Sequence, residues 1–302
     1  MTNSQPGLPP FGGEDARQVS ADQARVAVLP APWEGTVSYG AGAGRGPEAI
    51  LAASDQLEMY DEELDLEIDR VGLTTLPAPA IPPDATPEQA LDAIQASARA
   101  AIDQGKWLLT LGGEHSVSVP VWRALLEARK GRPFSILQID AHADLRQTYD
   151  GTPLSHACVM ARAHEMGLSF VQVGIRALCA DEREFLRREA LDENVFYDHR
   201  LAVTHRDKWM DEVVERLGEE VYITFDLDGL DPAIMPATGT PVPGGLSWHH
   251  ATRLLRKVGA ARKVIGADIT ELAPIPGMHA PDFLAARLAF KIIGYSLLAG
   301  RE

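Results

Sequence analysis

The sequence predicts an α/β fold, a three-layer α/β/α sandwich with a mostly parallel central sheet. Short apolar runs of strand length alternate with helix-length runs from residue 106 to residue 298. Such alternation is typical of parallel strands joined by crossover helices that cover both faces of a sheet. Several strand-like runs are followed directly by aspartate or histidine, and open α/β sheets bind ligands at the carboxyl ends of their strands.

The expected elements follow one another in a regular order. Thr86 is expected to cap a helix over 87–104, because its hydroxyl can accept a hydrogen bond from the first turn. The expected strands are 25–29, 65–71 (an edge strand), 106–111, 134–139, 169–175, 194–197, 221–225 and 262–268. The other expected helices are 48–57, 117–130, 155–167, 180–190, 205–217, 247–258 and 280–298. We expect one domain over residues 1–302, with 1–24 forming an irregular N-terminal arm.

The composition limits the possible classes of protein. The chain is 45% hydrophobic and has a formal net charge of −15, which argues against nucleic acid or an anionic membrane as a partner. We expect neither a signal peptide nor a membrane span, because the first residues lack a basic region followed by an apolar one and no apolar run is long enough to span a bilayer. Cys158 and Cys179 lack CxxC spacing, which fits a reducing compartment. We therefore expect a cytoplasmic protein.

The segment ILQIDAHADL, residues 136–145, joins an apolar strand to three potential metal ligands. Side chains alternate along an extended backbone, so Asp140, His142 and Asp144 are expected to point to one side. Two carboxylates and an imidazole at a strand end suit a divalent cation. The alternative is that the aspartates cap a helix and the histidine has no role, which would be the better interpretation of a single aspartate after a strand.

Two further strand ends repeat this arrangement. Asp226 and Asp228 follow the apolar strand 221–225, and His115 comes shortly after the strand that ends at Leu111. The carboxyl ends of parallel strands lie at one edge of a sheet, so these segments are expected to converge. The candidate metal ligands are therefore His115, Asp140, His142, Asp144, Asp226 and Asp228.

The charge of this cluster predicts two cations. Four aspartates packed together would repel one another and raise their pKa values, whereas two divalent cations would neutralise them. In binuclear centres the metals lie roughly 3.5–4 Å apart and share a water that becomes hydroxide near neutral pH. Oxygen-rich ligation without thiolate suits Mn²⁺, while Ni²⁺, Co²⁺ and Zn²⁺ stay open as alternatives.

Three other residues are candidates for binding substrate or moving protons. His156 could shuttle protons, because imidazole titrates near neutral pH, or it could be a helix-terminal histidine without a role. Glu271 could pair with a cationic substrate group or simply cap a loop, and Thr240 lies in a turn that could line the pocket. No role is assigned to the histidines at 164, 199, 205, 249, 250 and 279.

The glycine-rich stretch from Gly40 to Gly46 invites a nucleotide-binding interpretation. It is a long loop without a tight strand-to-helix turn, and no Gly-Lys-Ser/Thr follows it. A flexible loop at the rim of the site is the better interpretation.

Five motifs together resemble the ureohydrolase family of arginases, agmatinases and related amidinohydrolases. They are GGEHS (112–116), DAHAD (140–144), TFDLDGLDP (224–232), TGTPVPGGL (238–246) and TEL (270–272), in the family's order. The resemblance covers nearly the whole chain and implies the arginase-like fold. It also implies two Mn²⁺ per subunit and a homotrimer or homohexamer.

The resemblance further implies a role for each candidate. The implied ligand pairs are His115 with Asp144 for one metal, His142 with Asp228 for the other, and Asp140 with Asp226 as bridges. A bridging hydroxide would attack the guanidinium carbon of a small cationic guanidino substrate, and urea and an amine would leave. Asp144 would pass a proton to the leaving amine, His156 would exchange protons with bulk water, and Glu271 would pair with the guanidinium.

The loop LRQTYDGTPLSHACVM, residues 145–160, bears on the substrate. It resembles bacterial and archaeal agmatinases and lacks the serine-glycine-asparagine stretch with which arginases bind the α-carboxylate and α-amine. Agmatine, which would give putrescine and urea, is therefore the expected substrate. Aminopropylagmatine, guanidinobutyrate, guanidinopropionate, guanidine and arginine stay open as alternatives.

Two other classes of protein are possible. A single-zinc, deacetylase-like amidohydrolase would lack the second metal's ligands, yet all six candidate ligands are present. A non-catalytic binding protein on the same fold would be expected to have lost His156 or a bridging aspartate, and neither is lost.

Overall fold

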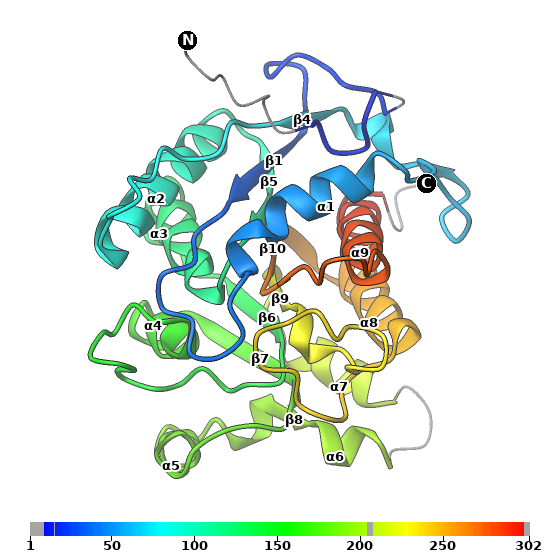
Figure 1. The fold of residues 1–302 in the computed structure, drawn as a ribbon. Helices are drawn as coiled ribbons and strands as arrows, with labels where there is room; N and C mark the ends of the chain where they lie inside the picture. Colours follow the sequence, from blue (N-terminus) through cyan, green and yellow to red (C-terminus); the bar gives the residue numbers. More distant parts are fainter. Residues whose placement is uncertain (1–8, 15, 204–207, 299–302) are drawn as a thin grey trace.

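A single eight-stranded sheet forms the centre of the computed structural model, which describes residues 9–14, 16–203 and 208–298. The strands in spatial order are β4 (Leu73–Thr75), β1 (Val26–Ala31), β5 (Trp107–Gly112), β10 (Lys263–Thr270), β9 (Glu220–Asp226), β6 (Ser135–Ile139), β7 (Ser169–Ile175) and β8 (Val195–Tyr197). Each of their pairings is parallel. The predicted α/β architecture is confirmed (Figure 1).

Helices cover both faces of this sheet, as Figure 1 shows. On one face lie α1 (Gly46–Ser54), α7 (Lys208–Arg216), α8 (Trp248–Ala261) and α9 (Ala280–Leu297). On the other lie α2 (Pro87–Asp103), α3 (Ser118–Ala128), α4 (Val159–Glu165) and α5 (Ala180–Arg188). The short helix α6 (Asp198–Leu201) follows β8.

The strands contribute side chains to two separate cores because successive residues of a strand point to opposite faces. In β1, Val26 and Val28 belong to the core under α1 and α9, while Ala27 and Leu29 belong to the core under α2 and α3. This explains why the strands read as continuous apolar runs without polar alternation.

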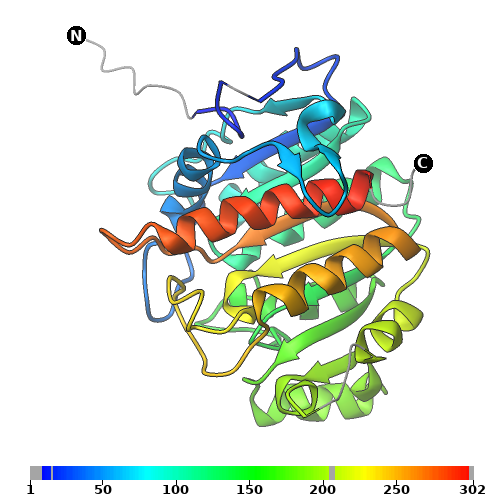
Figure 2. The same cartoon turned by 90° about the vertical axis from the view of Figure 1, so that its right-hand side faces the viewer.

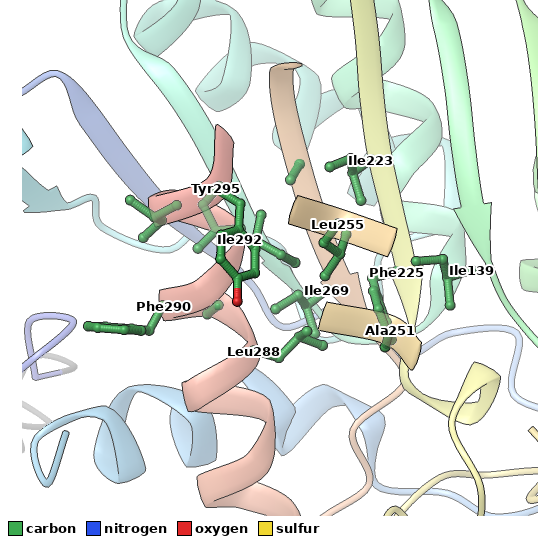
Figure 3. Packing of buried hydrophobic residues seen from close by; sticks show 14 of the residues in the cluster. Ile139, Ile223, Phe225, Ala251, Leu255, Ile269, Leu288, Phe290, Ile292 and Tyr295 are labelled. Carbon is green, nitrogen blue, oxygen red and sulfur yellow. The ribbon is translucent and has the colours of Figure 1, made fainter. Parts of the chain in front are cut away.

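Helix α9 is buried along nearly its whole length, and it lies across the sheet beside α8 in Figure 2. Figure 3 shows Leu288, Ile292 and Tyr295 of α9 close to Leu255 of α8 and Ile269 of β10. Each fully buried leucine or isoleucine contributes roughly 1.5–3 kcal/mol of transfer free energy. The helix therefore packs between α1 and α8 over β10, in the interior of the sheet.

Most predicted elements are present, and the cap of α2 is confirmed. The Thr86 side chain accepts a hydrogen bond from the Gln89 N–H, and the Gln89 side-chain oxygen accepts one from the Thr86 N–H. The region 9–24, as far as it is described, has turns and one isolated bridge at Gln18, with Phe11 buried. The prediction of one domain over the whole chain stays a prediction.

The predicted edge strand over 65–71 is wrong. Only β3 (Leu66–Glu67) is extended, in a hairpin with β2 (Tyr60–Asp61), and a 3₁₀ turn follows over Ile68–Val71. Ile68, an apolar residue of this segment, is buried because it packs against Gly294 of α9 and not because it belongs to a sheet. The strand at this edge of the sheet is β4, which comes directly after Gly72 at φ 75°, and β8 forms the other edge.

One helix begins later than predicted, and the predicted start of another lies outside the described residues. The segment predicted as helix 155–167 starts with a 3₁₀ turn over His156–Cys158, because the Ser155 side chain caps it by accepting from the Ala157 N–H, and only then becomes α4. The start of the helix predicted over 205–217 falls on residues 204–207, outside the described ranges, and the described part of α7 begins at Lys208.

Gly259 sets the distance between α8 and α9, because an added Cβ would lie 2.2 Å from the Tyr295 carbonyl oxygen. The Gly259→Ala variant should lose roughly 1–3 kcal/mol of unfolding free energy, since a backbone atom cannot move aside cheaply. Urea unfolding measures this loss. Gly218→Ala is the control, because its Cβ would meet only Ser135 Cβ at 3.4 Å. Equal stability of the two variants would contradict the close packing.

Candidate metal centre

The predicted ligands lie at the carboxyl ends of strands that are neighbours in the sheet. The order β5-β10-β9-β6 places the ends that precede His115, Glu271, Asp228 and Asp140 side by side. Ile139 of β6 pairs with Phe225 of β9, so the next residue of each strand, Asp140 and Asp226, stands at the same level. The register of the sheet therefore brings the carboxylates together.

The segment Asp140–Asp144 reaches the site by a route other than the predicted extended backbone. Strand β6 ends at Ile139, and Asp144 has a φ of 52°, in the left-handed region. Backbone hydrogen bonds to the segment after β7 hold this turn, including Ala143 N–H to the Ala177 carbonyl at 3.2 Å. The prediction that the three side chains converge is right, but simple strand alternation is not the cause.

The two histidines each face carboxylates through Nδ1. His115 Nδ1 lies 3.0 Å from Asp144 Oδ2, 3.2 Å from Asp140 Oδ2 and 3.4 Å from Asp226 Oδ2. His142 Nδ1 lies 3.0 Å from Asp228 Oδ2 and 3.6 Å from Asp140 Oδ1. Two groups of potential ligand atoms result, one with His115, Asp140 and Asp226, the other with Asp140, His142 and Asp228. Asp140 belongs to both groups.

The aspartates after β9 act as both cap and candidate ligand. A 3₁₀ turn over Leu227–Gly229 brings Asp228 back toward Asp226, and Asp226 Oδ1 accepts from the Asp228 N–H at 2.9 Å. Asp228 Oδ1 accepts from the Ala141 N–H at 3.0 Å, which joins the two ligand segments. In each carboxylate the second oxygen, Oδ2, faces a histidine.

Burial and mutual repulsion make this cluster costly when no cation balances it. Burial, together with Asp228 and Asp140, raises the pKa of Asp226 well above its usual range. Burial and the charge of Asp140 raise the pKa of Asp144 to about 7. Burial also opposes ionisation of Asp140, but hydrogen bonds from His115 and His142 lower its pKa overall.

The arrangement fits a pair of divalent cations. His115 Nδ1 is fully buried and has no hydrogen-bond partner, although three carboxylates lie within 3.4 Å of it. A lone pair surrounded by carboxylates in this way is the geometry of ligands around a cation. The donor set, with carboxylates and imidazoles and no thiolate, suits a hard or borderline metal.

A row of buried polar residues supports the ligands from within the sheet. Asp268, Thr224, Gln138 and Gln172 are aligned across β10, β9, β6 and β7 by the strand register. Thr224 Oγ1 lies 2.8 Å from His115 Nε2 and donates to Asp268 Oδ1 at 2.7 Å. Gln138 Nε2 donates to Asp140 Oδ2 at 2.7 Å. Such outer contacts orient metal ligands.

The cluster opens into a cavity of about 350 Å³. All three further candidates, His156, Thr240 and Glu271, line it. Thr240 Oγ1 donates to Asp228 Oδ2 at 3.5 Å, a long contact. Tyr149 and Glu182 line it as well, and neither was singled out from the sequence.

Glu271 is held by the segment that carries His115. Its Oε1 accepts from the His115 N–H at 2.7 Å, and its own N–H donates to the Gly113 carbonyl at 2.7 Å. Burial and the neighbouring Glu114 raise the pKa of Glu271 well above its usual range. A cation beside this carboxyl would restore its charge.

Val37, Ser38 and Tyr39, which directly precede the glycine-rich stretch in the loop after β1, line the cavity. Glu34 holds the loop by accepting from the Gly42 N–H at 2.6 Å and the Gly44 N–H at 2.9 Å. The other described histidines do not line the cavity, and His205 lies outside the described residues. Within the described ranges, no helix has the length and hydrophobicity to cross a membrane.

The fold and the two ligand groups define a protein that can hold divalent cations at the carboxyl edge of an open α/β sheet. The chain belongs to the arginase family, whose family model matches residues 24–294. It is 41% identical to an N(1)-aminopropylagmatine ureohydrolase of Thermus thermophilus over 286 residues, 94% of this chain and 93% of that one. It is 32% identical to an agmatinase of Pyrococcus horikoshii over 283 residues, 92% of this chain and 94% of that one.

A solved structure confirms the fold. Proclavaminate amidino hydrolase from Streptomyces clavuligerus superimposes with a TM-score of 0.86 at 26% identity, covering 97% of this chain and 98% of that one. Together with the relatives, this makes the chain a ureohydrolase that acts on linear amidines, as predicted.

Replacing Asp226 should have opposite effects on the metal-loaded and the metal-free protein. With Mn²⁺ present, Asp226→Asn should bind less metal and lose urea-forming activity, because a shared negative charge is gone. Without metal, it should unfold at the same or a higher temperature than wild type at pH 7, because the folded state raises the pKa of Asp226. Elemental analysis and thermal unfolding measure both effects. Asp231→Asn, an Asx turn outside the cluster, is the control.

Full metal content and wild-type rate in Asp226→Asn would contradict this assignment. The stabilisation of the metal-free variant should disappear at low pH. There the Asp226 carboxyl is protonated in the folded and the unfolded chain alike, so the linkage contribution vanishes.

Proposed function

We propose that this ureohydrolase cleaves N(1)-aminopropylagmatine, releasing urea and a triamine. The sequence alone favours agmatine. The relatives support the longer substrate, because identity is 41% to an aminopropylagmatine ureohydrolase and 32% to an agmatinase. Both compounds present the same guanidinium, so the reaction is common to both and only the distal end differs.

The observation that carries the reaction is that five of the six candidate ligands line one cavity with Glu271, and the sixth, Asp140, belongs to both ligand groups. Two divalent cations held there would supply a water that ionises near neutral pH and positive charge opposite the developing negative charge. The ligands are the two groups that share Asp140, with Asp144 completing the first. Mn²⁺ is the proposed metal.

The residues of the chain bind the guanidinium and move protons. Glu271 pairs with the substrate guanidinium at the end of β10, which orients its carbon toward the ligand cluster. Water adds to that carbon, the bond to the substituted nitrogen breaks, and this nitrogen leaves as an ammonium. Asp144 carries the proton to the leaving nitrogen, and His156 exchanges protons with solvent. Guanidinium and water thus become urea and ammonium with charge conserved.

Assembly and compartment complete the proposal. The family resemblance supports a homotrimer or homohexamer, and the sequence supports a cytoplasmic location. Glu182 and Glu271 line the cavity outside the ligand set and favour a substrate with cationic groups at both ends, since carboxylates raise the local concentration of cations.

Urea release by the Mn²⁺-loaded protein tests the substrate. N(1)-aminopropylagmatine should give a kcat/KM at least about tenfold above that of agmatine, since one added charged contact is worth about 1.5–3 kcal/mol. Guanidinobutyrate, guanidine and arginine should be poorer still. An agmatine kcat/KM equal to or above that of the longer compound would return the assignment to agmatinase. No urea from any of these compounds would contradict the proposed function.

Replacing Glu271 by glutamine should weaken substrate binding. Loss of the charge opposite the guanidinium should lower kcat/KM by roughly 10- to 100-fold, since a charge-assisted hydrogen bond contributes about 1.5–3 kcal/mol. Steady-state kinetics with metal content measured on the same samples test this. Glu88→Gln, on the exposed side of α2, is the matched control. Unaltered kinetics would refute the pairing.

A further inference from the structure

Glu114 is a fully buried carboxylate that belongs to neither ligand group. Its Oε2 accepts from the Gly35 N–H at 2.8 Å and the Thr36 N–H at 2.6 Å. Its Oε1 accepts from Thr36 Oγ1 at 2.8 Å and from Ser116 Oγ at 2.5 Å. Backbone N–H groups can only donate, so this carboxylate acts as an acceptor and fixes the loop that carries Thr36.

The Thr36 hydroxyl connects Glu114 to His156. A hydroxyl has one proton, and Thr36 donates it to Glu114 at 2.8 Å. Its lone pairs are then left to accept hydrogen bonds. The His156 backbone N–H donates to Thr36 Oγ1 at 3.0 Å, and His156 Nδ1 lies 3.2 Å from the same oxygen.

This chain of hydrogen bonds determines which ring nitrogen carries the proton. Since Thr36 Oγ1 has no proton left to give, His156 Nδ1 must be the donor in their contact. In the neutral imidazole the lone pair is then on Nε2. A histidine that takes up and releases protons needs one ring nitrogen fixed by a hydrogen bond and the other available to exchange protons.

We propose that Glu114 and Thr36 are positioning residues that fix the ring orientation and the Nδ1–H tautomer of His156. This inference rests on the proposed role of His156 as a proton shuttle. Thr36 and His156 are 120 residues apart, so the contact also joins the loop after β1 to the 3₁₀ turn before α4. The loop after β1 thereby acquires a function in holding His156, which lines the cavity.

Ser155 offers the competing arrangement. Its Oγ lies 3.3 Å from His156 Nδ1 and accepts from the Ala157 N–H at 3.4 Å, so its own proton could go to Nδ1. The Thr36 contact is the shorter of the two, and a buried carboxylate backs it. We therefore assign the control of the tautomer to Thr36 and Glu114.

The test uses the full-length Mn²⁺-loaded protein, its preferred substrate, and the variants Thr36→Val, Thr36→Ser and His156→Ala. Thr36→Val keeps the shape and removes the hydroxyl, so kcat should fall roughly 10- to 100-fold, less than the 10²–10⁴ that a complete general acid–base supplies, because His156 is still present. KM and metal content should stay within about twofold of wild type. Thr36→Ser should recover most of kcat, because it restores the hydroxyl.

A double-mutant cycle separates this role from loop packing. If Thr36 acts through His156, Thr36→Val should cost nothing further in the His156→Ala background. An equal loss in both backgrounds, or a Thr36→Ser variant as poor as Thr36→Val, would overturn the proposal. Loss of metal from Thr36→Val would overturn it too, since Thr36 would then act through Glu114 on the adjacent ligand His115.

The tautomer can be read directly, whatever the substrate is. Long-range ¹H–¹⁵N spectra of the full-length chain, labelled in its histidines and loaded with diamagnetic Zn²⁺, report which ring nitrogen carries the proton. The His156 signals, identified by their absence in His156→Ala, should show protonated Nδ1 in wild type and in Thr36→Ser. They should shift toward protonated Nε2 in Thr36→Val. Protonated Nε2 in wild type would overturn the proposal even if the protein proves inactive on every guanidino compound.

Discussion

The main constraint on this structure is the repulsion among four buried aspartates at the carboxyl edge of one parallel sheet. Asp140, Asp144, Asp226 and Asp228 are each at most 6% exposed, and burial penalises each charge. His115 and His142 balance the cluster only in part. Their backbone segments are nevertheless tied together by hydrogen bonds such as Ala141 N–H to Asp228. The fold holds the ligands in place, and two divalent cations would supply the missing charge.

The register of the sheet fixes this geometry more than the ligand segments themselves do. Strand pairing aligns three buried polar residues just before the strand ends, namely Gln138, Thr224 and Asp268. Gln138 and Thr224 each come two residues before a candidate ligand, Asp140 and Asp226. Through them His115 Nε2 and one oxygen of Asp140 are engaged, which leaves His115 Nδ1 directed at the carboxylates. A shift of one residue in the pairing of β9 would separate these groups and reverse the faces of the strand. The register of the strands therefore determines both the positions of the candidate ligands and the packing of the core.

The fold and the candidate ligands could be predicted because their signals are local. Apolar runs mark the strands, the Thr86-Pro87 pair marks a helix start, and Asp140 or Asp226 follows its strand directly. Contacts between distant segments could be predicted only where parallel strand ends meet, as for His115, Asp140 and Asp226, and not where loops meet. Glu114 and Thr36 are 78 residues apart, and nothing in either segment indicates that a loop hydroxyl reaches a buried carboxylate. The 65–71 prediction failed for the same reason, since packing against Gly294 explains the apolar Ile68.

The fold alone does not determine the substrate, because an enzyme named for proclavaminate superimposes with a TM-score of 0.86. What every such substrate requires of this chain is the paired metal site. The most direct test is a metal titration of the metal-free protein, monitored by elemental analysis, by activity, and by electron paramagnetic resonance of Mn²⁺. The charge of the cluster predicts about two Mn²⁺ per chain with spectra of a magnetically coupled pair. Full activity at one metal per chain, with the spectrum of an isolated ion, would contradict it.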